Sequence, residues 1–203
     1  SAALKDFLNS DTKVVNISAG IGETNKRVIG FITPLMKRLR EKGRIITVAA
    51  GNKSTNVDED SANDLLMHFV NKVMTQDING VDPSFRIMDN IVAVAACDQN
   101  GQLASFSNYG RHKVLLAASG VCIQSCTYVP NLFEGMNGTS QAAPQVAATL
   151  AMMVELFPTW SYRQIIDRLK YSVDQNSLLS AVTNSGGILN THNALASNRG
   201  GYR

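Results

Sequence analysis

Cysteine is scarce in this sequence, and its spacing excludes the structures that cysteines usually support. The 203 residues include three cysteines, at Cys97, Cys122 and Cys126. The last two lie in a segment expected to be extended, where their spacing puts them too far apart for a disulfide bond unless the chain forms a hairpin. A Cys-x-x-x-Cys pair with no second pair of ligands is also a poor zinc signal. We expect neither a disulfide framework nor a metal site.

An excess of one charge and long apolar runs are absent as well. The net charge is +3, and the basic residues are scattered, which argues against a nucleic-acid partner. No apolar run approaches the roughly 20 residues that a membrane-spanning helix needs, and no signal peptide opens the sequence. With 44% hydrophobic and 17% charged residues, the composition is that of an ordinary globular protein. We expect no nucleic-acid partner and no membrane partner.

Strand and helix patterns alternate along the chain. Val14–Ile17 is a short β-branched run, residues 26–42 carry apolar side chains at helical spacing, and residues 45–50 form a continuous apolar strand. Pro34 falls inside the helical pattern, which predicts either a kink or a helix that starts after Thr33. A strand, a helix and a parallel strand of these lengths form a right-handed crossover. The expected fold class is α/β, with a mainly parallel sheet flanked by helices.

One segment carries a chemical signal. Residues 137–144 read Asn-Gly-Thr-Ser-Gln-Ala-Ala-Pro, so a turn-forming run ends at Ser140 and opens an alanine-rich helix. Unpaired N–H groups and the positive end of the helix dipole can stabilise an anion there. Gly138 permits a close backbone approach, and Pro144 is expected within the first turn of the helix. On this local pattern Ser140 is either a nucleophile or a plain N-cap.

Residues 138–144 resemble the nucleophile signature of the subtilases, the subtilisin-like serine proteases. Residues 14–20 resemble the strand that lines the family's substrate cleft, and residues 45–52 resemble the strand that ends in the oxyanion-hole asparagine. Further segments match in the family's order, at residues 90–96, 104–110, 158–161 and 187–190. The resemblance implies a subtilisin-like fold and a single partial catalytic domain over residues 1–203, with an insertion at about residues 53–89.

The resemblance also implies acyl transfer and assigns roles to residues. Ser140 would attack a peptide carbonyl, and Asn52 would donate its side-chain amide to the oxyanion. Ser18, Ala19 and Gly20 would pair with an extended substrate, which makes a peptide or protein the expected substrate. A wall of the pocket for the residue before the scissile bond would come from Ala49, Ala50 and Gly51.

Two members of the catalytic triad are missing. The family's aspartate and its His-Gly-Thr histidine both precede the strand that matches Val14–Ile17, and none of His68, His112 and His192 stands where the general base belongs. We therefore expect a serine endopeptidase in the parent protein and an inactive isolated chain. The alternative is a non-catalytic subtilase-like module for peptide binding or assembly, although such a module has no chemical need for Ser140 and Asn52.

The absence of the two triad residues also leads us to expect a protein partner for this chain. An upstream segment carrying the aspartate and the histidine would supply central strands of the sheet, so its absence would leave an exposed edge that this segment or a dimer covers. No cofactor is expected: calcium occurs in the family, but the acidic run that begins at Asp58 lacks alternating oxygen ligands. The insertion is expected to pack beside the cleft and shape specificity or autoinhibition. The resemblance favours a secreted or extracytoplasmic location and leaves a cytoplasmic one open.

Overall fold

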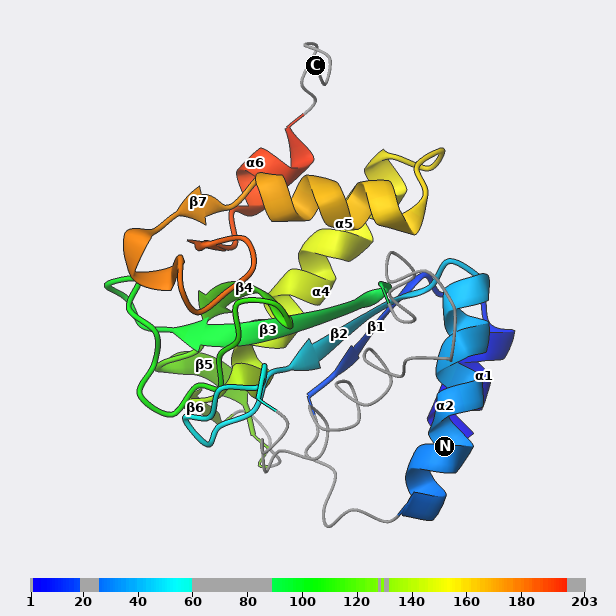
Figure 1. The fold of residues 1–203 in the computed structure, drawn as a ribbon, viewed down its shortest axis with the longest axis horizontal. Coiled ribbons are helices and arrows are strands. Elements are labelled where there is room, and N and C mark those ends of the chain that lie inside the picture. Colours follow the sequence, from blue (N-terminus) through cyan, green and yellow to red (C-terminus); the bar gives the residue numbers. More distant parts are fainter. Residues whose placement is uncertain (1, 19–25, 60–88, 128, 130–131, 197–203) are drawn as a thin grey trace.

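The computed structural model describes residues 2–18, 26–59, 89–127, 129 and 132–196. Two helices and two strands open the chain: α1 (Ala2–Asn9), β1 (Val14–Ile17), α2 (Lys26–Glu41) and β2 (Ile45–Ala49). The elements that follow are β3 (Ile91–Cys97), β4 (Val114–Ser119), β5 (Ile123–Cys126), β6 (Phe133–Met136), α4 (Thr139–Leu156), α5 (Tyr162–Tyr171), β7 (Asp174–Gln175), the 3-10 turn η1 (Ser177–Leu179), β8 (Gly187–Ile188) and α6 (Thr191–Leu195). Figure 1 shows them arranged around one central sheet.

The central sheet has six strands in the order β1-β2-β3-β4-β8-β7. All neighbouring pairs are parallel except β7 with β8, which is antiparallel. Every residue of β2 and β3 is buried, as expected for parallel strands covered on both faces. The predicted α/β class with a mainly parallel sheet is confirmed. Strand β1 lies at one edge, and its residues are only half-buried.

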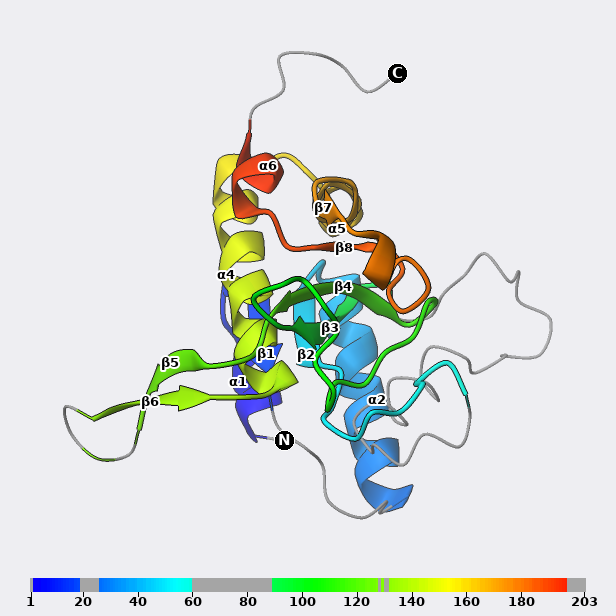
Figure 2. The ribbon, with the colours of Figure 1, turned by 90° about the vertical axis from the view of Figure 1, so that its left-hand side faces the viewer.

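Helices cover both faces of this sheet. Figure 2 shows α2 and α4 on opposite sides of the strands. Because side chains alternate along a strand, Ala93 and Ala95 of β3 join the core under α2, whereas Val92 and Val94 join the core under α4. The first core also takes in the end of α1, and the second takes in α5 and α6.

Helix α2 contains Pro34 and runs without interruption from Lys26 to Glu41. Of the two alternatives at Pro34, a kink or a helix that starts after Thr33, the second is therefore wrong. Pro34 is exposed on the outer side, while Leu35, Met36 and Leu39 are at most 8% exposed in the core. Burial of those side chains offsets the hydrogen bond that proline removes.

Strands β5 and β6 form a separate antiparallel hairpin between β4 and α4. Figure 2 shows it projecting away from the body of the molecule. Phe133 at the start of β6 is 62% exposed. The segment holding Cys122 and Cys126 does run as a strand toward a hairpin, and both thiols are free and exposed. The helices of the described ranges include none long and apolar enough to cross a bilayer.

Candidate active site

Several loops that follow the sheet strands meet the start of α4 at the carboxyl edge of the sheet. Ser18 directly follows β1, Asn52 is the third residue after β2, and Gly120 directly follows β4. The Ser18 hydroxyl donates to the Ser140 carbonyl, while Asn52 Oδ1 and the Gly120 carbonyl accept the N–H groups of residues 139 and 138. The carboxyl edge of a parallel sheet is the usual position of sites in α/β proteins. The sequence-predicted residues Ser140, Asn52 and Ser18 are thus brought together by the fold.

Ser140 is the second residue of α4 and is half-buried. The N-cap is Gly138, which makes no side-chain capping bond, so the interpretation of Ser140 as a plain N-cap is wrong. Its Oγ instead donates to the backbone oxygen of Ser18, at 3.2 Å. Gly138 has a φ of 156°, a backbone conformation that L side chains rarely adopt. Glycine is therefore needed at the turn that presents the serine.

Pro144 lies one turn deeper in α4 than the sequence predicts. The helix begins at Thr139, which makes Pro144 its sixth residue, whereas the expectation placed it within the first turn. In that position its missing N–H removes the donor that would serve the carbonyl of Ser140. The Ser18 hydroxyl donates to that carbonyl at 3.0 Å. A contact from β1 thus occupies the acceptor that proline leaves open within the helix.

Asn52 is held from one side by Thr139. Its Oδ1 accepts the backbone N–H and the hydroxyl of Thr139, each at 2.9 Å. The Thr139 hydroxyl in turn accepts the N–H of Gly51, at 3.1 Å. Asn52 is exposed, and its Nδ2 has no recorded acceptor within the part of the chain that the structure describes. The amide that faces away from Thr139 is therefore free to donate to a ligand at the start of α4.

Asn108 fixes the loop that carries Asn52. Its side chain is fully buried. Nδ2 donates to the carbonyl of Ala50 at 2.8 Å, and Oδ1 accepts the N–H groups of Lys53 at 2.9 Å and Thr55 at 3.1 Å. The sequence analysis assigned no role to Asn108 or to Thr139. The sequence did contain a signal for Asn108, because it lies within the matched segment 104–110. A buried side-chain amide forms hydrogen bonds to other groups of the protein.

The remaining predicted substrate residues divide into two groups. Ala49 and Ala50 are 7% and 0% exposed, with their side chains in the two cores. The N–H of Ala50 donates to the Val94 carbonyl at 2.9 Å, so Ala50 has both backbone polar groups engaged within the protein. Gly51 is half-buried with a φ of 104°, a conformation that favours glycine. Ala19 and Gly20 lie outside the described residues.

Neither described histidine lies near Ser140. His112 precedes β4, so it stands at the amino edge of the sheet, separated from the carboxyl edge by a strand about 17 Å long. His192 is exposed in α6, which contacts α4 through the hydroxyls of Thr191 and Thr149, 2.8 Å apart. Thr149 lies nine residues beyond Ser140, or about 13 Å along the helix. His68 lies outside the described residues.

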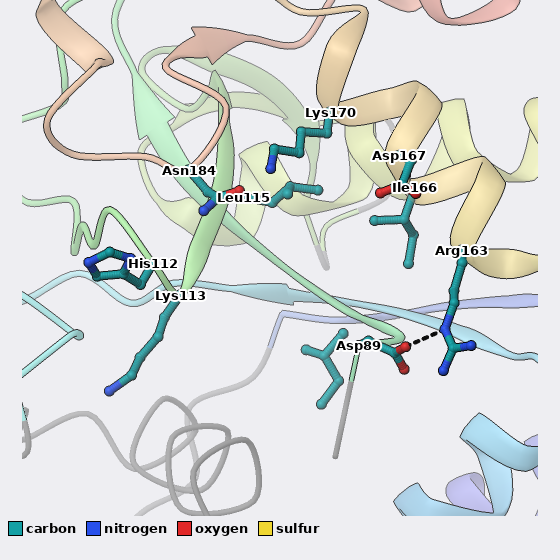
Figure 3. Close-up of a pocket in the computed structure, with 10 residues that line it drawn as sticks. Asp89, His112, Lys113, Leu115, Arg163, Ile166, Asp167, Lys170 and Asn184 are labelled. Carbon is teal, nitrogen blue, oxygen red and sulfur yellow. Dashed lines mark hydrogen bonds and ion pairs between the residues drawn. The ribbon is translucent and has the colours of Figure 1, made fainter. Parts of the chain in front are cut away.

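A cavity of about 250 Å³ opens at the amino edge of the sheet, below α5. Figure 3 shows His112 and Lys113 on one side of it and Asp89 with Arg163 on the other. Asp89 Oδ1 accepts from Arg40 at 2.6 Å and from the Tyr162 hydroxyl at 2.8 Å, while Oδ2 accepts from Arg163 at 2.5 Å. These contacts join α2, α5 and the start of β3. The cavity lies at the opposite edge of the sheet from Ser140.

The described residues hold no group of three or more His, Cys, Asp or Glu side chains able to bind a metal ion. Asp58 is the first residue of the acidic run. Its carboxylate accepts the backbone N–H groups of His112 and Lys113, both at 3.0 Å. Lys113 Nζ donates to the carbonyls of Val57 and Asp58, both at 3.1 Å. Asp58 is thus engaged in anchoring a loop. Most of the predicted insertion, residues 60–88, lies outside the described residues.

Comparison with known proteins gives one family and one fold. The family model described as the subtilase family matches residues 1–194. A thermostable alkaline protease of Halalkalibacterium halodurans is 43% identical over 79 residues, which cover 39% of this chain and 21% of that protein. Subtilisin BL of Lederbergia lenta is 40% identical over 105 residues, 52% of this chain and 38% of that protein. The matched regions thus span from a fifth to two fifths of these relatives.

Solved structures share the fold at lower sequence identity. The A-subunit of the AB5 toxin from E. coli superposes with a TM-score of 0.73 and 22% identity. The superposition covers 96% of this chain and 64% of the toxin subunit. At this level of identity the likeness concerns the fold alone, and it extends over nearly the whole chain.

Proposed function

Because the chain belongs to the subtilase family, a family of serine proteases, we propose that it is the nucleophile-bearing part of a serine endopeptidase of subtilisin type. Ser140 is the nucleophile that forms the acyl-enzyme, and Asn52 donates to the oxyanion. The general base and its aspartate come from upstream sequence. The isolated chain is inactive, because a serine without a base is a poor nucleophile at neutral pH.

The observation that carries this proposal is the attachment of Asn52 to Thr139. Thr139 immediately precedes Ser140, and its two bonds to Asn52 Oδ1 fix the amide plane beside the nucleophile. An oxyanion hole needs donors that are oriented before the reaction, since reorienting them during it costs free energy. Asn52 Nδ2, together with the backbone N–H of Ser140 in the first turn of α4, supplies two such donors.

The hydroxyl of Ser140 currently donates to the carbonyl of Ser18. A base that arrives from upstream would have to accept this proton instead, and the hydroxyl would turn toward it. The carbonyl of Ser18 would then be available to the N–H of a bound peptide. This exchange supports the proposed pairing of residues 18–20 with an extended substrate.

The proposed pocket wall is a backbone feature. Since the side chains of Ala49 and Ala50 lie in the cores, what they present to a substrate is the main chain that leads to Gly51. Gly51 and Asn52 are the accessible residues of this segment. A substrate side chain before the scissile bond would therefore rest against a thin, uncharged wall.

The upstream segment has two surfaces on which to dock. One is the outer edge of β1, which pairs with no strand among the described residues and whose residues are half-buried. The other is the outer side of α4, where Met152 and Leu156 are 45% and 51% exposed and Ala148 and Ala151 are exposed beside them. A group of exposed apolar side chains of this kind is typical of a surface that another protein segment covers. A dimer through the β1 edge is the competing occupant.

Labelling with a fluorophosphonate tests the proposed function. The full-length protein should label at Ser140 rapidly and stoichiometrically and should hydrolyse peptides, whereas residues 1–203 alone should do neither. Ser140→Ala in the full-length protein is the matched control and should abolish labelling. A full-length protein that folds and binds peptides but never labels would support the non-catalytic module instead.

Location and the insertion complete the proposal. Family resemblance favours a secreted or extracytoplasmic location over a cytoplasmic one, and fractionation of the source cells would decide between them. The described start of the insertion packs near the site, because Ser54 N donates to the Phe106 carbonyl at 2.9 Å and Tyr109 N to the Thr55 carbonyl at 3.1 Å. Deleting residues 55–81 from the full-length enzyme should change its peptide preference, and an unchanged cleavage profile would refute a role in specificity.

A further inference from the structure

The carbonyl of Ser140 accepts a hydrogen bond from outside its own helix. In an α-helix it would accept the N–H of the residue four positions later, but that residue is Pro144, which has none. The proline ring also crowds the carbonyl four residues before it, which favours turning that carbonyl away from the helix. Here the Ser18 hydroxyl donates to it at 3.0 Å. A side chain 122 positions away thus supplies the donor that the helix lacks.

The direction of this bond is set by a chain of side chains that begins in β2. Thr47 Oγ1 has two acceptors, Asn16 Oδ1 at 3.0 Å and the Val15 carbonyl at 3.3 Å, of which Asn16 is the nearer. Asn16 Nδ2 donates to Ser18 Oγ at 2.8 Å. With its oxygen lone pair occupied by Asn16, the Ser18 hydroxyl directs its own proton to Ser140. Every donor along this chain points toward α4.

Two of these residues are poorly explained by the sheet itself. Thr47 is fully buried in a strand whose other residues are apolar, and asparagine is disfavoured in strands. A buried hydroxyl costs free energy unless it is paired. The pairing of Thr47 with Asn16 removes that cost and orients the Asn16 amide.

We propose that Thr47, Asn16 and Ser18 are positioning residues for the nucleophile, acting through the Ser140 carbonyl that Pro144 leaves without a helical donor. The proposal rests on the proposed function, since it concerns the same serine. It adds a tether, the series of hydrogen bonds from Thr47 through Asn16 and Ser18 to the Ser140 carbonyl, which connects β1 and β2 to the first turn of α4. The Ser140 main chain is held in place while its Oγ turns between Ser18 and a base.

A double-mutant cycle in the full-length protein tests the tether. Ser18→Ala should lower the urea midpoint by about 0.5 M, from the loss of one hydrogen bond to a half-buried acceptor. Pro144→Ala restores an N–H donor to the Ser140 carbonyl, so Ser18→Ala in the Pro144→Ala background should shift the midpoint by less than half as much. Equal shifts in both backgrounds would overturn the proposal.

Kinetics separate positioning from mere stability. Thr47→Val, which keeps the shape of the side chain, should lower kcat about three- to tenfold with KM nearly unchanged, and Thr47→Ser should restore most of the loss. Asn16→Asp should lower kcat further, because a carboxylate attracts the Ser18 proton away from Ser140. Thr47→Val with a normal kcat would refute the positioning role. An inactive wild-type protein would refute the proposed function, while the midpoint cycle would still decide whether the tether exists.

Discussion

The side-chain oxygen of Asn52 accepts two hydrogen bonds from Thr139, one from the backbone N–H and one from the hydroxyl. The residue before the proposed nucleophile Ser140 therefore orients the amide proposed to bind the oxyanion. This relationship couples two loops that are 87 positions apart in the sequence. It also separates the roles of neighbouring residues, because Thr139 is fully buried while Asn52 is exposed.

Replacing Thr139 with valine should lower turnover without changing substrate affinity. The hydroxyl gives one bond to Asn52 and receives one from Gly51, so its loss leaves the amide held by the backbone N–H of Thr139 alone. We expect kcat of the full-length protein to fall about tenfold, with KM unchanged. Thr139→Ser keeps the hydroxyl and should stay within about twofold of wild type. Equal losses in the two variants would mean that the methyl group, not the hydroxyl, matters.

Replacing Asn108 with leucine should destabilise the protein strongly. The change leaves the Ala50 carbonyl and the Lys53 and Thr55 N–H groups without their present partner. We expect a loss of about 3 kcal/mol in the free energy of unfolding, measured with urea. Asn100→Ala, at an exposed position, is the control and should stay within about 0.5 kcal/mol. A stable Asn108→Leu protein would contradict the anchoring role.

Asp89 should make stability depend on pH at the acidic end. Burial alone would raise the pKa of its carboxyl, but hydrogen bonds from Arg40, Arg163 and Tyr162 together lower that pKa below its ordinary value. A lowered folded-state pKa means that the stabilisation is present above about pH 4 and is lost as the pH falls through the folded-state value.

Asp89→Asn should therefore lower the free energy of unfolding by about 2 kcal/mol at pH 7. The difference from wild type should shrink as the pH falls from about 4 through the lower folded-state pKa, because the unfolded chain takes up the proton first and the folded protein only below that pKa. Asp167→Asn changes an exposed carboxylate at the same cavity and should have little effect at either pH. Urea unfolding at a series of pH values measures all three proteins, and a constant difference would contradict this account.

The three cysteines should differ in reactivity. Burial, with a smaller contribution from Asp98, raises the pKa of Cys97 to about 11, whereas Cys122 and Cys126 are exposed. A thiol reagent at pH 8 should modify two thiols per folded chain and the third only after denaturation. Cys97→Ala should leave the folded count at two, and rapid modification of Cys97 in the folded protein would contradict its burial.

The main features of the fold could be predicted from local sequence. Strands β2 and β3 are buried on both faces of the sheet and therefore appear in the sequence as continuous apolar runs. Helix α2 is buried on one face and therefore shows apolar residues at helical spacing. The helical range from residue 26 was predicted, but Pro34 left a start after Thr33 open as an alternative, since buried packing can offset a local backbone cost. The separate β5–β6 hairpin had no comparable signal, as neither strand is continuously buried.

The site could be predicted in part. Ser140 and Asn52 were recognised from the segments that resemble a family, and both lie at the carboxyl edge of the sheet. The roles of Thr139 and Asn108 were not, because their function lies in which distant backbone groups they reach. Pro144 was assigned to the wrong turn, since the helix start at Thr139 depends on Gly138 and its contacts.

The sequence by itself determined the α/β class and membership of the subtilase family, because both depend on residue order within short segments. It also determined that the family's His-Gly-Thr segment is absent from these residues. Only the tertiary structure decided how Ser140, the proposed nucleophile, is held. The bonds from Asn52 to Thr139 and from Ser18 to Ser140 cross 87 and 122 positions. No local pattern encodes them, since they form only when strands and helix pack together.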